Sequence, residues 1–207
     1  MLAAIRSAAV LGVDAYAVTV EVDAAAGLPG WTMVGLPSGS VKEARERVGA
    51  ALANAGLQLP PRRWTVNLSP ADVRKDGTAF DLPVALGALV ASGQLSADAV
   101  EGLLCVGELG LDGSIRPIRG ALPLARAARE SGARALVLPA ANAAEAALLR
   151  DVRLAPCATL GELVAQLRAG ALPPAPTAIA TPVDEPSACL SEVVGQALGS
   201  STGVAIA

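Results

Sequence analysis

Hydroxyl groups and lysines are the residues of this chain that could support nucleophilic chemistry. The chain has no histidine, so the commonest general base in proteins is missing. Lys75 lies in a polar segment at 71–78, three residues before Thr78, and Ser69 lies just upstream. A hydroxyl nucleophile needs a base within hydrogen-bond reach, so a pair of Thr78 and Lys75 is conceivable. A threonine in such a segment is more commonly a turn or capping residue, which is the role expected here.

Neither the thiols nor the carboxylates are spaced like metal ligands. Cys105, Cys157 and Cys189 are odd in number and far apart, which favours free thiols in a reducing compartment over a disulfide framework or a zinc site. Asp76 and Asp81 flank a turn and the start of an apolar helical pattern. Without further oxygen ligands at regular spacing, we expect turn and helix-cap carboxylates there and no metal site.

Nucleotide binding is not indicated by any glycine-rich segment. No GxxxxGK[ST] motif occurs in the sequence, so the backbone cradle and the lysine that hold ATP phosphates are missing. Gly199 and Gly203 are a coincidence of spacing in a small-residue tail. We therefore expect no nucleotide site in this chain.

Six basic residues could gather on one surface and contact DNA phosphates, although the net charge of the chain is −3. These candidates are Arg45, Arg47, Arg62, Arg63, Arg74 and Lys75. Aromatics make up only 2% of the residues, so we expect little base stacking, with Trp64 packed into the core. The alternatives are an ordinary solvated helix face with salt bridges such as Glu43–Arg47, or a role in protein–protein contact and ring assembly.

Hydrophobic periodicity predicts an α+β fold with a mixed sheet covered by helices. Two alternating runs precede the first helix, which argues against a doubly wound sheet. Ser38 or Ser40 with Glu43 predicts a helix that starts with a capping box, faces water with its charged residues and ends at Gly56. The expected strands are 3–11, 15–23, 31–34, 63–68, 104–108 and 135–138, with a hairpin turn at 112–113. The expected helices are 38–56, 81–92, 121–130, 142–149 and 159–169.

Composition predicts one folded domain at 1–170 and a proline-rich linker with a short tail at 171–207. The apolar run 7–13 is too short for a signal peptide and continues an alternating strand pattern. The run 82–97 is interrupted by Pro83 and by glycines, which indicates a buried helix and no membrane span. A cytoplasmic protein is expected.

Several segments, taken in order, resemble the N-terminal, ChlI-type domain of the ComM/YifB family of magnesium-chelatase-like AAA+ ATPases. The resemblance covers about 1–170, and 190–196 is similar to the lead-in to the family's AAA+ module. The matching segments are 28–37, 41–48, 66–72, 75–83, 106–109 and 113–118.

The resemblance implies the Lon-protease-like fold, a two-layer α/β sandwich with a left-handed crossover that a ribosomal-protein domain shares. Active Lon relatives use a serine activated by a lysine. The position that matches the serine is Ala79, and the position that matches the lysine is Leu122. Neither side chain can give or accept a proton, so the resemblance implies a domain whose catalytic dyad is vacated.

The resemblance also implies a function for the full-length protein. That function is branch migration of DNA during homologous recombination and natural transformation, powered by a hexameric ring that binds ATP and Mg outside this chain. This domain would contribute to ring assembly or to contact with DNA or a partner, with no cofactor of its own. Two alternatives remain open, a cryptic Lon-like peptidase that uses Thr78 or Ser69 and a subunit of a magnesium-chelatase-type ATPase.

Overall fold

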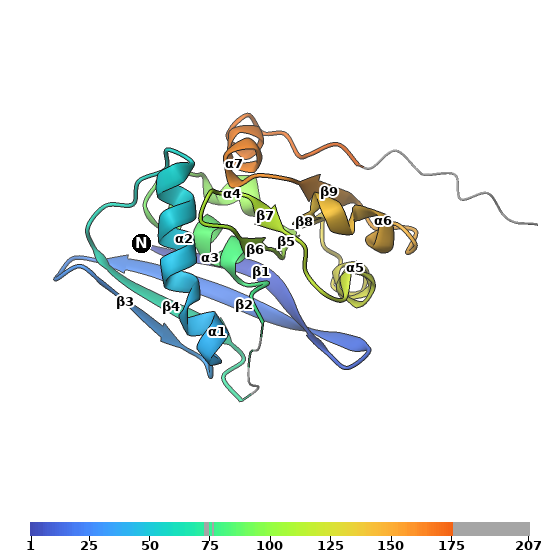
Figure 1. Cartoon of the computed structure of the whole chain (residues 1–207), viewed down its shortest axis with the longest axis horizontal. Coiled ribbons are helices and arrows are strands. Elements are labelled where there is room, and N and C mark those ends of the chain that lie inside the picture. The colour runs from blue at the N-terminus through green and yellow to red at the C-terminus, as the bar shows by residue number, and fades with distance from the viewer. Residues whose placement is uncertain (73–74, 76, 176–207) are drawn as a thin grey trace, which may run out of the picture.

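A long antiparallel hairpin forms the centre of the molecule (Figure 1). The computed structural model describes residues 1–72, 75 and 77–175. Strand β1 (Leu2–Leu11) pairs with β2 (Asp14–Ala25) over its whole length, with Ile5 opposite Val20. Every second residue of β2 from Val18 to Ala24 is buried, while Thr19 and Glu21 are only partly covered. The predicted alternation is confirmed.

The outer strands on one side of the hairpin are joined by helices. Strand β3 (Gly30–Val34) lies at the sheet edge and is parallel to β4 (Arg63–Ser69), which pairs antiparallel with β2. Between β3 and β4 run α1 (Gly39–Lys42) and α2 (Ala44–Asn54). The predicted single helix is therefore divided at Glu43, and the predicted capping box is wrong. The Ser38 hydroxyl is hydrogen-bonded to that of Ser40, 2.9 Å away, and caps no backbone N–H.

On the other side of the hairpin three short parallel strands extend the sheet. Strand β5 (Leu103–Cys105) pairs with β1, then β8 (Ala135–Pro139) and β9 (Leu154–Cys157) follow. The sheet is mixed and has seven strands, in the order β3-β4-β2-β1-β5-β8-β9. The prediction of a mixed sheet covered by helices is confirmed. Strand β9 was not predicted because its four residues, Leu-Ala-Pro-Cys, show no alternation and contain a proline.

The remaining elements refine the predicted order. The expected strand 104–108 is divided, because Gly107 bends the chain after β5 and β6 (Glu108–Leu109) pairs with β7 (Ile115–Arg116) in a separate ribbon. The short helix α4 (Ala97–Val100) was not predicted, and the expected helix 142–149 is a 3₁₀ turn, η1 (Ala140–Asn142), followed by α6 (Ala143–Ala146). Three helices were predicted correctly: α3 (Asp81–Ala91), α5 (Ala121–Glu130) and α7 (Leu160–Arg168).

The apolar core lies on both faces of the sheet. Helices α2, α3 and α7 pack on one face, and α3 is buried along its whole length. Helices α5 and α6 pack on the other face, over β5, β8 and β9. All five residues of β8 are buried, since both of its faces are covered. The expected two-layer arrangement therefore fits only the β2–β4 half, where Thr65 and Asn67 leave the second face polar. In the described part of the chain, no helix has the length and apolar character needed to cross a membrane.

We predict that replacing glycine by alanine has opposite effects on stability at two helical positions. A Cβ at Gly87 of α3 would lie 2.6 Å from a methyl group of the buried Val22, whereas a Cβ at Gly49 of α2 would meet nothing within 4 Å. We expect Gly87→Ala to lower the free energy of unfolding by about 1–2 kcal/mol, because overpacking outweighs the gain in helix propensity. Gly49→Ala should raise it by about 0.5–1 kcal/mol. Urea unfolding curves measure both, and a Gly87→Ala variant as stable as Gly49→Ala would contradict the packing of α3 on the hairpin.

Candidate functional site

The segment that resembles the serine loop of active Lon relatives is hydrogen-bonded to the turn after β5. The N–H of Gly107 donates to the carbonyl of Ala79 at 2.8 Å, and the N–H of Leu82 donates to the carbonyl of Gly107 at 3.0 Å. The N–H of Leu109 donates to a carboxylate oxygen of Asp81 at 3.2 Å. These bonds join the start of α3 to β6, and we call this region the α3–β6 junction.

A buried ion pair anchors the junction to α2. The Arg47 guanidinium donates from Nε to Oδ2 of Asp81 at 2.6 Å and from Nη2 to Oδ1 at 2.9 Å. The Asp81 side chain is only 1% exposed. Burial raises the pKa of Asp81, and the hydrogen bond from Arg47 opposes that rise, while the same hydrogen bond raises the pKa of Arg47. The prediction that Asp81 caps the helix is therefore wrong, because its carboxylate accepts from Arg47 and Leu109.

Arg47 does not fit the predicted DNA surface. Its side chain is 18% exposed, and Nη2 also donates to the carbonyl of Ser40 at 2.9 Å. The expectation that it faces water on the helix was wrong, because Asp81, which is 34 positions away in the sequence, draws it inward. A guanidinium with three intramolecular hydrogen bonds would have to give them up to contact a phosphate.

A hollow of about 400 Å³ opens beside the junction. Ala79 lines it together with Pro117 and Ile118, which lie just before Leu122, the position that matches the lysine, and with Leu124 of α5. Leu122 is not among the lining residues; it is 39% exposed, and its N–H donates to Glu145 at 3.1 Å. The structure thus brings Ala79 to the expected segment, and the proximity of Ala79 and Leu122 stays a prediction.

The hydroxyl in this hollow has a partner other than lysine. Thr78 Oγ1 donates to Oε2 of Glu108, whose other carboxylate oxygen lies 3.9 Å from Nη1 of Arg116. The carbonyl of Thr78 accepts from the N–H of Asp81 at 3.2 Å, in the turn before α3. The turn role expected for Thr78 agrees with this geometry.

Lys75 is buried and forms no pair with Thr78. Its side chain is 0% exposed, and its Nζ has no hydrogen-bond partner in the described part of the chain. Burial lowers the pKa of this amine. The backbone of Lys75 bridges to Pro37, where its N–H donates to Leu36 and its carbonyl accepts from Ser38. Lys75 therefore does not fit the DNA surface either, because a phosphate cannot reach a fully covered amine.

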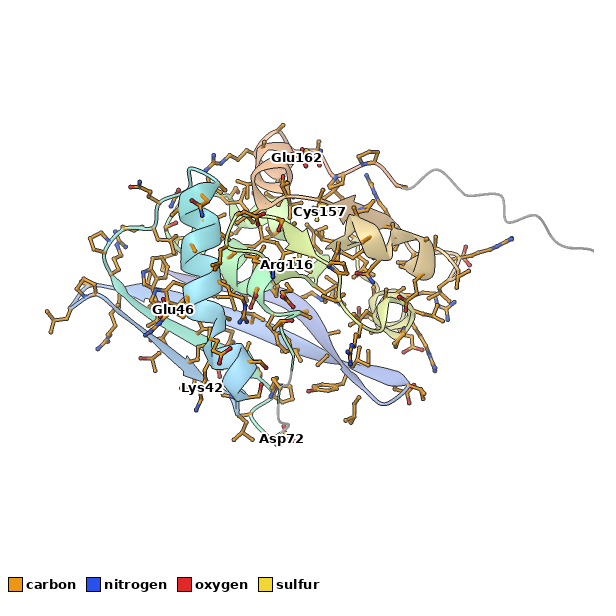
Figure 2. All side chains as sticks on the ribbon, in the orientation of Figure 1. Lys42, Glu46, Asp72, Arg116, Cys157 and Glu162 are labelled. Carbon is orange, nitrogen blue, oxygen red and sulfur yellow. The ribbon has the colours of Figure 1, made fainter. Side chains whose placement is uncertain are left out.

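The other basic candidates differ in their exposure and in their ion pairs. Arg62 and Arg63 are exposed at the start of β4. Arg45 is exposed and pairs with the neighbouring Glu46, with Nη2 and Oε1 2.5 Å apart. Arg74 lies outside the described residues. Lys42 and Glu46 lie on the helical stretch of α1 and α2 (Figure 2). Lys42 and Arg45 of this stretch line a hollow beside β3.

Thiol and metal chemistry have no support in the described residues. Cys105 and Cys157 are both buried and free. Burial raises the pKa of the Cys105 thiol and raises that of Cys157 to about 12, which makes both poor nucleophiles at neutral pH. Cys189 and Asp76 lie outside the described residues. In the described part of the chain, no three His, Cys, Asp or Glu side chains are grouped so that they could hold a metal ion.

The sequence did not reveal which side chains pair with one another at a distance along the chain. Nothing in the spacing of Arg47 and Asp81 indicates that they meet. Trp31 was predicted only as a strand residue, yet its indole stacks on that of Trp64 with ring centroids 5.5 Å apart. A signal existed for this second pair, because both are strand residues in alternating patterns and parallel pairing aligns them. Trp64 itself is 2% exposed, as predicted.

The family model described as "Subunit ChlI of Mg-chelatase" matches residues 20–142, which include α1, α2 and the whole α3–β6 junction. The chain belongs to the ChlI family. The arrangement around Ala79 and Asp81 is therefore that of a ChlI-type domain, and we use this name below.

Relatives of the ChlI-type domain are longer proteins. The chain is 47% identical over 150 residues to the competence protein ComM of Haemophilus influenzae and 46% identical over 148 residues to the uncharacterized protein YifB of Salmonella typhimurium. Each match covers 72% of the chain and 29% of the relative. An uncharacterized protein of Mycobacterium bovis is 42% identical over 192 residues, 92% of the chain and 38% of the relative. The chain thus spans about a third of the length of these relatives, in their N-terminal region.

Cross-linking tests whether Ala79 and Leu122 mark one vacated site. We expect an Ala79→Cys, Leu122→Cys double variant to be joined by a thiol reagent whose spacer is about one side chain long, because the resemblance puts both positions at one vacated site. Leu28 is exposed at the far end of the sheet, so Ala79→Cys, Leu28→Cys is the matched control. Mapping by mass spectrometry separates these links from links to the natural cysteines. Equal yields in the two variants would show that Leu122 does not match the lysine position.

Proposed function

We propose that this chain is a non-catalytic N-terminal domain of a ComM/YifB-type AAA+ ATPase that processes DNA. The full-length protein would drive branch migration in homologous recombination and natural transformation in the cytoplasm, and this domain would contribute to ring assembly or to contact with DNA or a partner. The Haemophilus relative is a competence protein, which supports a role in DNA uptake.

The observation that carries the proposal is the chemistry of the hollow beside the α3–β6 junction. Ala79 offers a methyl group where active Lon relatives have a serine, and the hydroxyl beside it is already bonded to Glu108. The only lysine of this segment is buried without a partner among the described residues. Active Lon relatives need a serine in contact with a lysine base, and this hollow has neither a serine nor a lysine among its lining residues. The scaffold around the site is nevertheless held by several hydrogen bonds.

The fold proposal follows the same resemblance. We take the mixed sheet to be that of the Lon-protease and ribosomal-protein type, with helices added over β5, β8 and β9. The connection from β3 through α1 and α2 to the parallel β4 is where we place the left-handed crossover. ATP and Mg would bind in the AAA+ module of the full-length protein, which would form a hexameric ring.

A magnesium-chelatase-type subunit is the second candidate, because the family model carries that description. A chelatase ATPase subunit would hold its nucleotide in a phosphate loop, and the sequence has no such motif. The whole chain therefore supports an accessory domain better than an ATPase core.

The chain should hydrolyse neither ATP nor unfolded protein substrates. The physical reason is the missing phosphate cradle and the missing serine–lysine pair. Phosphate release and cleavage of a labelled casein-type substrate measure the two activities. The control is Thr78→Ala, which removes the hydroxyl of the hollow. Turnover that survives purification and disappears in Thr78→Ala would establish the cryptic peptidase instead.

A chimera tests the positive part of the proposal. Replacing the matching N-terminal region of Haemophilus ComM by residues 1–170 of this chain should preserve natural transformation, since the relatives share 47% identity over this region. Deletion of the region is the comparison and should reduce transformation. If the chimera is expressed and forms rings but transforms no better than the deletion, the proposed accessory role in DNA processing is wrong.

A further inference from the structure

A groove runs between α2 and the edge strand β3, away from the α3–β6 junction. Two surface hollows of about 410 and 430 Å³ share Trp31 as a lining residue. The first extends from Trp31 along Gly49 and Ala53 of α2 to Pro60 and Arg62. The second extends from Trp31 past Met33 to Lys42 and Arg45. The two hollows adjoin at Trp31, and we call them together the α2–β3 groove.

Trp31 is a fixed, partly exposed aromatic ring at the middle of this groove. It stacks on Trp64 with an interplanar angle of 21°, and Trp64 is itself held in the core at 2% exposure. The two residues are in-register neighbours on β3 and β4, so their backbones are held by sheet hydrogen bonds. One face of the Trp31 ring is thus covered by Trp64. A ring held in this way loses little conformational freedom when a second flat group stacks on it.

The charges of the groove suit a ligand with phosphates on both sides of a flat group. Lys42 and Arg45 line one end, and Arg62 lines the other. No acidic side chain is among the residues that line the two hollows. Glu46 lies close by and pairs with Arg45, but both side chains are more than half exposed. Exposed pairs of this kind contribute only about 0–1 kcal/mol, so a phosphate can compete with Glu46.

We propose that the α2–β3 groove binds single-stranded nucleic acid, with a base stacked on Trp31 and the flanking phosphates near Arg62 and Lys42. Aromatic rings in a positively charged groove are the general means by which proteins hold single strands. A duplex is excluded from this mode because its bases are already stacked within the helix. The choice of nucleic acid as ligand rests on the proposed function, whereas the groove itself does not. The proposal differs from the expectation from composition, little base stacking, in assigning one stacked base to Trp31.

Tryptophan fluorescence tests the proposal directly, since Trp31 and Trp64 are the only tryptophans of the chain. Titrating the 207-residue protein with unlabelled oligo-dT at low salt should quench the emission. Trp31→Ala should weaken binding, measured by anisotropy of a fluorescent oligo-dT, about 5- to 150-fold, the loss expected for one stacked base. Trp31→Phe should retain part of the affinity, because phenylalanine still offers a flat face.

Charge reversals test the phosphate contacts independently of the ring. Arg62→Glu should lower the affinity and reduce the slope of log K against log salt by about 0.7 for each phosphate that the variant no longer neutralises. Arg150→Glu is the matched control, because Arg150 is exposed between α6 and β9, at the opposite end of the sheet from β3. Circular dichroism melting curves check that each variant is folded.

Three outcomes of the binding experiments would overturn the proposal. The first is no quenching at low salt, and the second is equal binding by folded Trp31→Ala and the wild type. The third is quenching by a proline-rich peptide but not by oligo-dT, which would assign the groove to a protein partner. Placing Trp31→Ala in the Haemophilus chimera separates this proposal from the proposed function. A chimera that fails even with Trp31 intact refutes the accessory role, whereas unchanged transformation with Trp31→Ala refutes only the groove.

Discussion

The ion pair between Arg47 and Asp81 is the contact on which the arrangement of the ChlI-type domain depends. It ties α2 to the start of α3, and through the N–H of Leu109 it also fixes β6. Asp81 is 1% exposed, so removal of Arg47 would leave a buried carboxylate unpaired, at a cost of about 3–5 kcal/mol. Both candidate sites of the domain lie next to elements that this pair joins. The α3–β6 junction carries the hollow with Ala79, and α2 forms one wall of the groove around Trp31.

The two sides of α2 therefore differ in the chemical groups that they present to a ligand. On the junction side, hydrogen bonds hold a scaffold whose hollow contains a methyl group and a hydroxyl already bonded to Glu108. On the β3 side, exposed cations and a stacked indole remain available to a ligand. An alanine at position 79 is compatible with this scaffold, because Asp81 and the backbone of Gly107 carry the structural contacts, and neither depends on residue 79 bearing a nucleophile.

Periodic features were predictable from the sequence, and long-range pairings were not. Alternation in β2 and the apolar run of α3 specify their burial, so these elements were predicted nearly to the residue. Strand β9 shows no alternation of polar and apolar residues that could be detected. The expected strand 104–108 is divided at Gly107, whose backbone is hydrogen-bonded to Ala79 and Leu82, which are distant in the sequence. The basic candidates show the same limit for the site. Arg62 and Arg63 are exposed, but Asp81 takes up Arg47 and the fold covers Lys75, which no local pattern reveals.

A double-mutant cycle on Arg47 and Asp81 measures the central contact most directly. The variants are Arg47→Met, Asp81→Leu and the double variant, with Arg45→Met as the control for a surface arginine, and urea unfolding gives the free energies. We expect Arg47→Met to cost about 3–5 kcal/mol, since it leaves the buried Asp81 carboxylate without its cation, and Asp81→Leu to cost less, because Arg47 keeps contacts with Glu43 and Ser40. The double variant should cost less than the sum of the two single changes. Arg45→Met should change stability by about 0–1 kcal/mol. Additive losses in the pair, or an Arg47→Met variant no less stable than Arg45→Met, would contradict the account.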